Sequence, residues 1–75
     1  MVYLQENWEN LANAIIIQAA NDYRKALRQL RRNPNYASAA YTKHEVEQFF
    51  RSQWFHFLTN VDPEYLIEEL ARADL

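Results

Sequence analysis

The fold class is decided by residues 11–30, which read LANAIIIQAANDYRKALRQL. Apolar side chains recur in this stretch at intervals of three and four residues, and the spacing continues back to Trp8. This period is typical of an amphipathic helix whose apolar stripe faces a core. Asn33 tolerates the left-handed conformation and Pro34 disfavours helical geometry before it, so the pair favours a helix end. The sequence therefore predicts a helix over about residues 5–32.

Two further helices are predicted downstream of this stretch. Thr42 and Glu45 have the spacing of a capping box, which favours a second helix over about residues 43–59. Its expected buried face holds Val46, Phe49, Phe50, Trp54, Phe57 and Leu58. The Asp62-Pro63 pair suits the N-cap and first positions of a third helix over about residues 63–73.

Together these helices predict an all-α fold in which residues 1–75 form a single helical domain. We expect a small three-helix bundle, with room for a short extra helical turn at residues 36–40 in the first loop. The most apolar window, residues 11–20, is interrupted by Asn13 and Gln18 and is too short to cross a bilayer. With no signal peptide recognisable at the start, we expect a soluble protein of the cytoplasm.

The composition excludes several classes of functional site. The 75 residues contain no glycine and no cysteine, and the formal net charge is −2. Phosphate-cradling loops need glycine, while disulfides and thiolate metal sites need cysteine.

Two pairs of side chains were candidates for chemistry, and both fail on physical grounds. Ser52 and His56 are one helical turn apart, but no glycine turn supplies an oxyanion hole beside them. His44 and His56 lie about 18 Å apart along one helix, too far to bind the same metal ion. We therefore expect a protein that is not an enzyme, with no catalytic residues, no metal and no cofactor.

Cationic residues gather at the end of the first predicted helix. Arg24, Arg28 and Arg31 follow one another at i, i+4 and i+7, so they share one face, opposite the apolar stripe. This face is either a solvated helix end that complements the helix dipole, or a contact surface for phosphates or an acidic protein.

Two apolar residues fall outside the stripes of their predicted helices. Ile17 and Phe55 each point about 150° away from the centre of the stripe, and Phe55 lies near Arg51. Phe55 is expected either at a contact surface or buried against the first loop or the third helix. The candidate partner-binding residues are therefore Ile17, Arg24, Arg28, Arg31, Arg51 and Phe55.

Residues 11–20 followed by Asp22-Tyr23-Arg24 form one distinctive segment, and residues 47–55, EQFFRSQWF, followed by residues 58–62 form another. Together they resemble small uncharacterised proteins that bacterial prophages and conjugative elements carry. Glycine often follows the aspartate in that group, whereas Pro63 stands here. The resemblance brings no catalytic or binding residues, but it implies a small accessory protein that binds or inhibits host machinery, including defence complexes.

The sequence thus favours a non-enzymatic helical protein that acts by binding another protein, as a phage or mobile-element inhibitor of a host defence complex (anti-CRISPR-like) would. The alternative is a nucleic-acid-binding accessory protein that places its arginines on phosphates. A third interpretation is a homodimer that buries the aromatic helix, because so short a chain carries 11 aromatic residues (two Trp, five Tyr and four Phe). No membrane partner is expected.

Overall fold

The computed structural model describes residues 2–73, with side chains from residue 7 onward, and every regular element in this part of the chain is a helix. α1 (Val2–Arg32) is followed by α2 (Ala37–Phe50), α3 (Gln53–Leu58) and α4 (Pro63–Ala73). The predicted all-α fold is confirmed. The described residues form four helices where the sequence predicted three, because the second predicted helix is divided.

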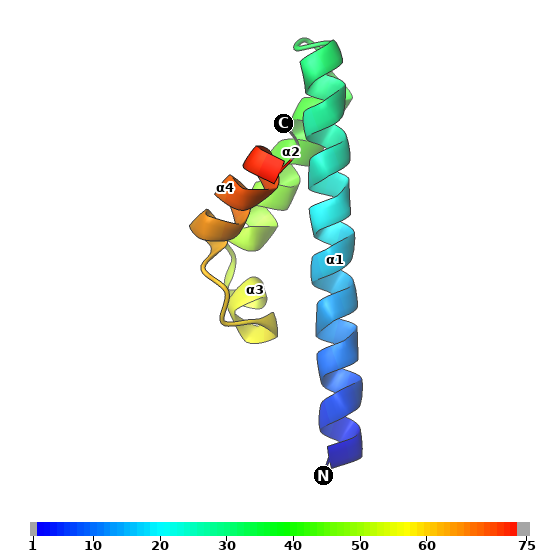
Figure 1. Ribbon diagram of the computed structural model, residues 1–75, viewed down its shortest axis with the longest axis vertical. Coiled ribbons are helices and arrows are strands. Elements are labelled where there is room, and N and C mark those ends of the chain that lie inside the picture. Colours follow the sequence, from blue (N-terminus) through cyan, green and yellow to red (C-terminus); the bar gives the residue numbers. More distant parts are fainter. Residues whose placement is uncertain (1, 74–75) are drawn as a thin grey trace.

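α1 forms the long axis of the molecule, whose greatest extent is 49 Å. α2, α3 and α4 all lie on one side of α1 (Figure 1). α2 and α4 lie beside its C-terminal half, whereas its first turns extend past α3 with no helix alongside. No helix in residues 2–73 is long and apolar enough to cross a membrane.

The end of α1 falls where the sequence predicted, but its geometry differs. The Asn33 N–H donates to the carbonyl oxygen of Gln29 at 2.9 Å, and the Asn33 side chain accepts a hydrogen bond from the Asn35 N–H at 3.1 Å. Within residues 2–73 no residue has a positive φ, so the left-handed conformation expected of Asn33 is wrong. The side-chain hydrogen bond and Pro34 end the helix instead.

α2 begins at Ala37, earlier than the sequence predicted. Tyr36 occupies the N-cap position with extended geometry, and Thr42 lies inside the helix, so the predicted capping box is wrong. Alanine is the strongest helix former, and three of residues 37–40 are alanine. Ala39 is also buried, so tertiary packing adds to this preference and the expected short turn becomes the start of α2.

The chain breaks helical geometry at Ser52, which divides the predicted helix over residues 43–59 into α2 and α3. Ser52 has extended backbone geometry, with φ −86° and ψ 162°. Its hydroxyl donates to the carbonyl oxygen of Phe49 at 2.6 Å and accepts from the Phe55 N–H at 3.3 Å. One side chain therefore satisfies the end of α2 and caps the start of α3.

This break reorients every side chain after residue 52. Phe55 is 0% exposed and Phe57 is 74% exposed, the reverse of what a continuous helix predicts. The expected burial of Trp54 and Phe57 on one inner face is therefore wrong, and of the two positions left open for Phe55 the structure shows burial. The third predicted helix is confirmed as α4, with the Asp62 side chain accepting from the Glu64 N–H at 3.2 Å.

One core draws on all four helices. Its buried residues are Tyr23, Val46, Phe50, Phe55 and Leu70. The Phe55 ring contacts those of Phe49 and Phe50 at centroid distances of 5.8 and 5.4 Å, both edge to face. Such aromatic pairs add about 0.5–1.5 kcal/mol beyond the burial of their area.

Candidate binding surfaces

A hydrogen-bonded network of charged groups joins α1, α2 and α4 at the edge of the core. The Tyr23 hydroxyl donates to Oε2 of Glu47 at 2.6 Å, and Nζ of Lys43 donates to the same oxygen at 2.8 Å. The Arg51 guanidinium donates to both carboxylate oxygens of Glu64, from Nε at 2.7 Å and from Nη2 at 3.0 Å. Arg51 also lies 3.9 Å from Glu47.

The network shifts the titration of its members. Burial alone raises the pKa of the Glu47 carboxyl, but hydrogen bonds from Lys43 and Tyr23 and the nearby positive charges outweigh it and hold that pKa below its usual value. Burial, reinforced by the hydrogen bond to Glu47, raises the pKa of Tyr23 well above its usual value. The hydrogen bond from Arg51 lowers the pKa of Glu64.

These contacts give Arg51 a role inside the molecule. Its two parallel hydrogen bonds to Glu64 tie the end of α2 to the start of α4. Phe55, the other candidate from this region, is a core residue. Burial therefore removes Phe55 from any contact surface, whereas Arg51 keeps 49% of its side chain exposed.

The candidates on α1 lie along its exposed length. Ile17, Arg24, Arg28 and Arg31 are all exposed. Arg28 and Arg31, with Arg32, line a shallow hollow of about 320 Å³ near the C-terminal end of α1. The structure thus brings two of the predicted arginines together, while Ile17 lies nearly two helical turns before Arg24.

A second surface, which the sequence did not reveal, is apolar. Trp8 and Trp54 pack edge to face with ring centroids 6.5 Å apart and yet are 45% and 49% exposed. Leu11, one turn after Trp8, is 54% exposed, and Phe57 follows Trp54 at the same spacing. We call these four residues the apolar surface. It was missed because its α3 half exists only after the break at Ser52.

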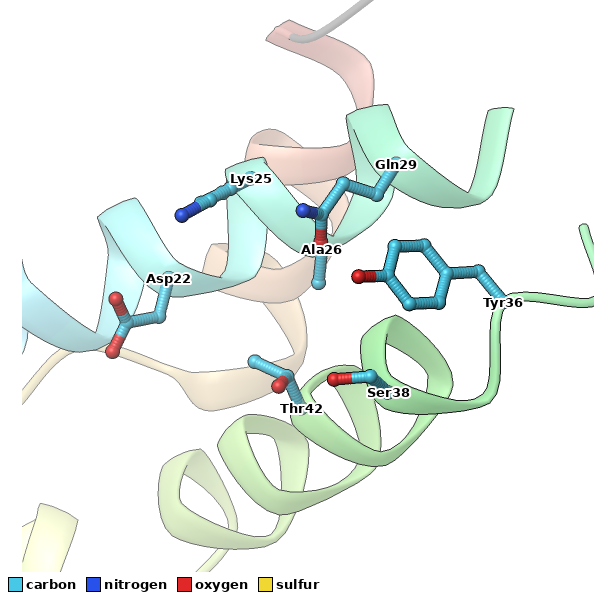
Figure 2. Close-up of a pocket in the computed structure, with 7 residues that line it drawn as sticks. All are labelled: Asp22, Lys25, Ala26, Gln29, Tyr36, Ser38 and Thr42. Atoms are coloured by element: carbon cyan, nitrogen blue, oxygen red, sulfur yellow. The ribbon is translucent and has the colours of Figure 1, made fainter. Parts of the chain in front are cut away.

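A polar pocket of about 430 Å³ lies between α1 and α2. Figure 2 shows the Tyr36 ring reaching between the two helices with its hydroxyl directed toward Ala26. The polar side chains around it are Asp22, Lys25, Gln29, Ser38 and Thr42. Hydroxyl, amide, amine and carboxylate groups of this kind bind a polar molecule by hydrogen bonds.

Of the candidates for chemistry, Ser52 has a structural role, whereas His44 and His56 are exposed. The Ser52 hydroxyl is committed to the Phe49 carbonyl, so it serves as a cap. Among the described residues, no group of three or more His, Cys, Asp or Glu side chains is placed to hold a metal ion.

Comparison of the chain with protein-family models, with curated proteins and with solved structures finds no match.

Proposed function

We propose that this chain is a non-enzymatic helical protein that acts by binding another protein through the apolar surface. The observation that carries the proposal is the exposure of Trp8, Leu11, Trp54 and Phe57 on a chain of only 75 residues. Aromatic residues, tryptophan and tyrosine above all, are enriched at the centres of protein interfaces. A single exposed apolar residue is ordinary, but here a contacting tryptophan pair has a further exposed apolar residue one turn away on each helix.

The surroundings of the patch support a protein partner. Residues 7–21 of α1 carry one charge, Glu9, so little charge has to lose water when this side of α1 is covered. The Trp8–Trp54 contact fixes α3 against α1, so a partner meets a surface that is already ordered. Ordering before binding lowers the entropy cost of association.

The experiment compares three immobilised proteins in a host-cell lysate: wild type, Phe57→Gln and Tyr65→Gln. Tyr65 is a matched control because it is 60% exposed but lies on α4. We expect the wild type and Tyr65→Gln to capture the same proteins, and we expect Phe57→Gln to lose them. Further copies of the chain itself count among the captured proteins. Capture of the same set by all three would contradict the proposal.

Inhibition of a host defence complex is one role within this class. It is supported by the resemblance to proteins of prophages and conjugative elements. Such an inhibitor acts by occupying a surface of its target, which requires a rigid contact face and no catalytic group.

A second candidate function is nucleic-acid binding, favoured by the hollow that Arg28, Arg31 and Arg32 line. Arginine recognises phosphate with two parallel hydrogen bonds, and Arg24 lies one turn earlier. Against it, α4 carries Glu64, Glu68 and Glu69, which repel a phosphate backbone. If arginines contact phosphates, the logarithm of the affinity falls with that of salt concentration, with a slope of about −0.9 per duplex phosphate neutralised. Absence of a gel shift at about 50 mM salt would dispose of it.

A further inference from the structure

We infer that the partner covering the apolar surface is a second copy of this chain, packed antiparallel against the N-terminal half of α1. This inference rests on the proposed function, because it names the occupant of the same surface. It follows from the spacing of the residues on α1, from the charges that flank them, and from the position of α3.

The spacing is that of helix pairing. Trp8, Leu11 and Ile15 follow one another at intervals of three and four residues, as do the a and d positions of a heptad. Ile15 is half-buried and shares a shallow hollow with Val46 and Phe49 of α2. Trp8 and Leu11 are about half exposed, and Figure 1 shows no helix alongside the first turns of α1. Most helical stability in proteins comes from packing of the apolar face. The half-exposed Trp8 and Leu11 therefore leave apolar area on which a further helix can pack.

On α1 itself, the flanks of the seam formed by Trp8, Leu11 and Ile15 carry no charge, while Asp22 and Glu45 line the hollow beside Ile15. Asn7 and Ala14 border it on one side and Ala12 borders it on the other. Charges at such flanking positions select one partner helix over another and set its orientation. Uncharged flanks provide no opposite charge for a charged partner and do not repel an identical helix. Glu9 points about 130° away from the centre of the seam, at 100° per residue.

The position of α3 selects the antiparallel arrangement. Ala12 is 3% exposed, on the side of α1 where Trp8 meets Trp54, whereas Asn7 and Ala14 are exposed on the other flank. A parallel pair needs both flanks of each helix, because one flank of each chain faces the opposite flank of the other. In an antiparallel pair the exposed flanks, which carry Asn7 and Ala14, face each other. The two α3 helices then contact each other on the opposite side, and this contact covers Trp54 and Phe57.

The four residues of the apolar surface supply about two thirds of the area that a stable dimer requires. With about 150–250 Å² for a buried aromatic side chain, the four residues of the apolar surface supply on the order of 400 Å² per copy, or about 800 Å² for two. A stable specific interface buries at least about 1,200 Å² in total. The exposed neighbours of the seam on both copies, Asn7, Asn10 and Ala14 among them, contribute the remaining area.

The first test is sedimentation of the full chain from micromolar to submillimolar concentration. We expect a reversible monomer–dimer equilibrium, and we expect Leu11→Gln to raise its dissociation constant at least about tenfold, since removing a centrally buried side chain typically has an effect of this size. Tyr65→Gln is the control and should sediment as the wild type does. Circular dichroism checks that each variant is folded.

The second test exchanges charges on the open flank, where Asn7 of one copy lies opposite Ala14 of the other. The acidic variant carries Asn7→Glu with Ala14→Glu, and the basic variant carries Asn7→Lys with Ala14→Lys. All four changes are at exposed helix positions and introduce good helix formers. We expect each variant alone to dimerise about tenfold more weakly than the wild type at low salt, and an equal mixture to recover the dimer.

A wild type that is strictly monomeric at every concentration would overturn the second copy as the occupant. So would a dimer that neither Leu11→Gln nor the charged variants weaken, because its interface would lie elsewhere. The capture experiment with Phe57→Gln tests the proposed function separately, since a monomeric chain still captures a host protein through the apolar surface if the proposed function is right.

Discussion

Phe55 and Phe57 are two residues apart in the sequence and have opposite environments. Phe55 is enclosed by Phe49 and Phe50, whereas Phe57 faces solvent on the apolar surface. The hydroxyl of Ser52 decides between them, because its two hydrogen bonds end α2 and start α3. A single polar side chain thus determines which aromatic residues enter the core and which are presented to a partner.

The two phenylalanines should differ sharply in their contributions to stability. Phe55→Ala leaves a cavity in the core and should lower the free energy of unfolding by about 3–5 kcal/mol. Phe57→Ala removes an exposed ring and should change it by no more than about 0.5 kcal/mol. Urea denaturation of the wild type and both variants, measured at a concentration where the chain is monomeric, tests this. Equal losses for the two variants would contradict the environments described here.

Glu47 should make stability depend on pH in the acid range. Its pKa in the folded chain lies below the usual value of 4.5. A carboxyl with a lowered folded pKa contributes stability above its unfolded pKa, and this contribution is lost as the pH falls through the folded value. The melting temperature of the wild type should therefore fall more steeply than that of Glu47→Gln as the pH drops below about 4.5.

The matched control for this measurement is Glu68→Gln, at an exposed glutamate on α4. Its melting temperature should follow the pH profile of the wild type. If Glu47→Gln shows the same acid slope as the wild type, the network around Tyr23 and Lys43 is not what stabilises the folded chain at neutral pH.

At the scale of helices, the sequence predicts a helix end correctly where one residue acts on its own helix. It predicts the end wrongly where tertiary packing overrides that local preference. Asp62-Pro63 starts α4 as predicted, because a capping carboxylate and a proline at the first position act locally. The Thr42 signal was overridden by the alanines before it and by the burial of Ala39. The break at Ser52 was not predictable from periodicity, because the apolar spacing of Phe49, Phe50 and Trp54 suits one continuous helix.

The break at Ser52 also explains why the sequence predicts the exposed arginines of α1 but not the apolar surface. The arginines of α1 are exposed as the stripe predicts, because α1 is one uninterrupted helix. The sequence predicts Trp54 and Phe57 in the core, because one continuous helix over residues 43–59 would turn both side chains inward. The contact between Trp8 and Trp54 joins residues far apart in the sequence, so only the fold reveals it.

Ser52→Ala should weaken the junction between α2 and α3. The loss of the cap should lower the free energy of unfolding by about 1 kcal/mol, within the range of 0.5–2 kcal/mol for such changes. Ser52→Asp is the informative partner variant, because an aspartate also accepts a hydrogen bond from the Phe55 N–H and should restore part of the loss. Equal stability of the wild type and Ser52→Ala in urea denaturation would show that the hydroxyl does not cap α3.

At the scale of the whole molecule, the shape is uneven. α2 and α4 pack on one side of the C-terminal half of α1 and α3 lies nearer its N-terminus, while the first turns of α1 project beyond them (Figure 1). A chain of about 60–75 residues has a small core and little stability to spare, so a projecting amphipathic helix benefits from a partner. A second copy supplies the same seam and covers both α3 helices at once.

The projecting turns should respond to that partner in hydrogen exchange. At high concentration, the backbone amides of residues 7–15 in the wild type should exchange more slowly than in Leu11→Gln. The amides around Tyr23 and Phe50, which lie in the core of each chain, should exchange alike in both proteins once the difference in global stability is taken into account. Equal exchange of residues 7–15 in the two proteins would contradict a partner on this face.

The most direct measurement is tryptophan fluorescence, because the two tryptophans of the chain, Trp8 and Trp54, both belong to the apolar surface. Their emission therefore reports on this surface and on nothing else. If a second copy covers it, the emission of the wild type shifts to shorter wavelength as the concentration rises through the dimerisation range, while that of Leu11→Gln shifts only at higher concentration. An emission spectrum of the wild type that stays the same from nanomolar to submillimolar concentration would show that no second copy covers the surface.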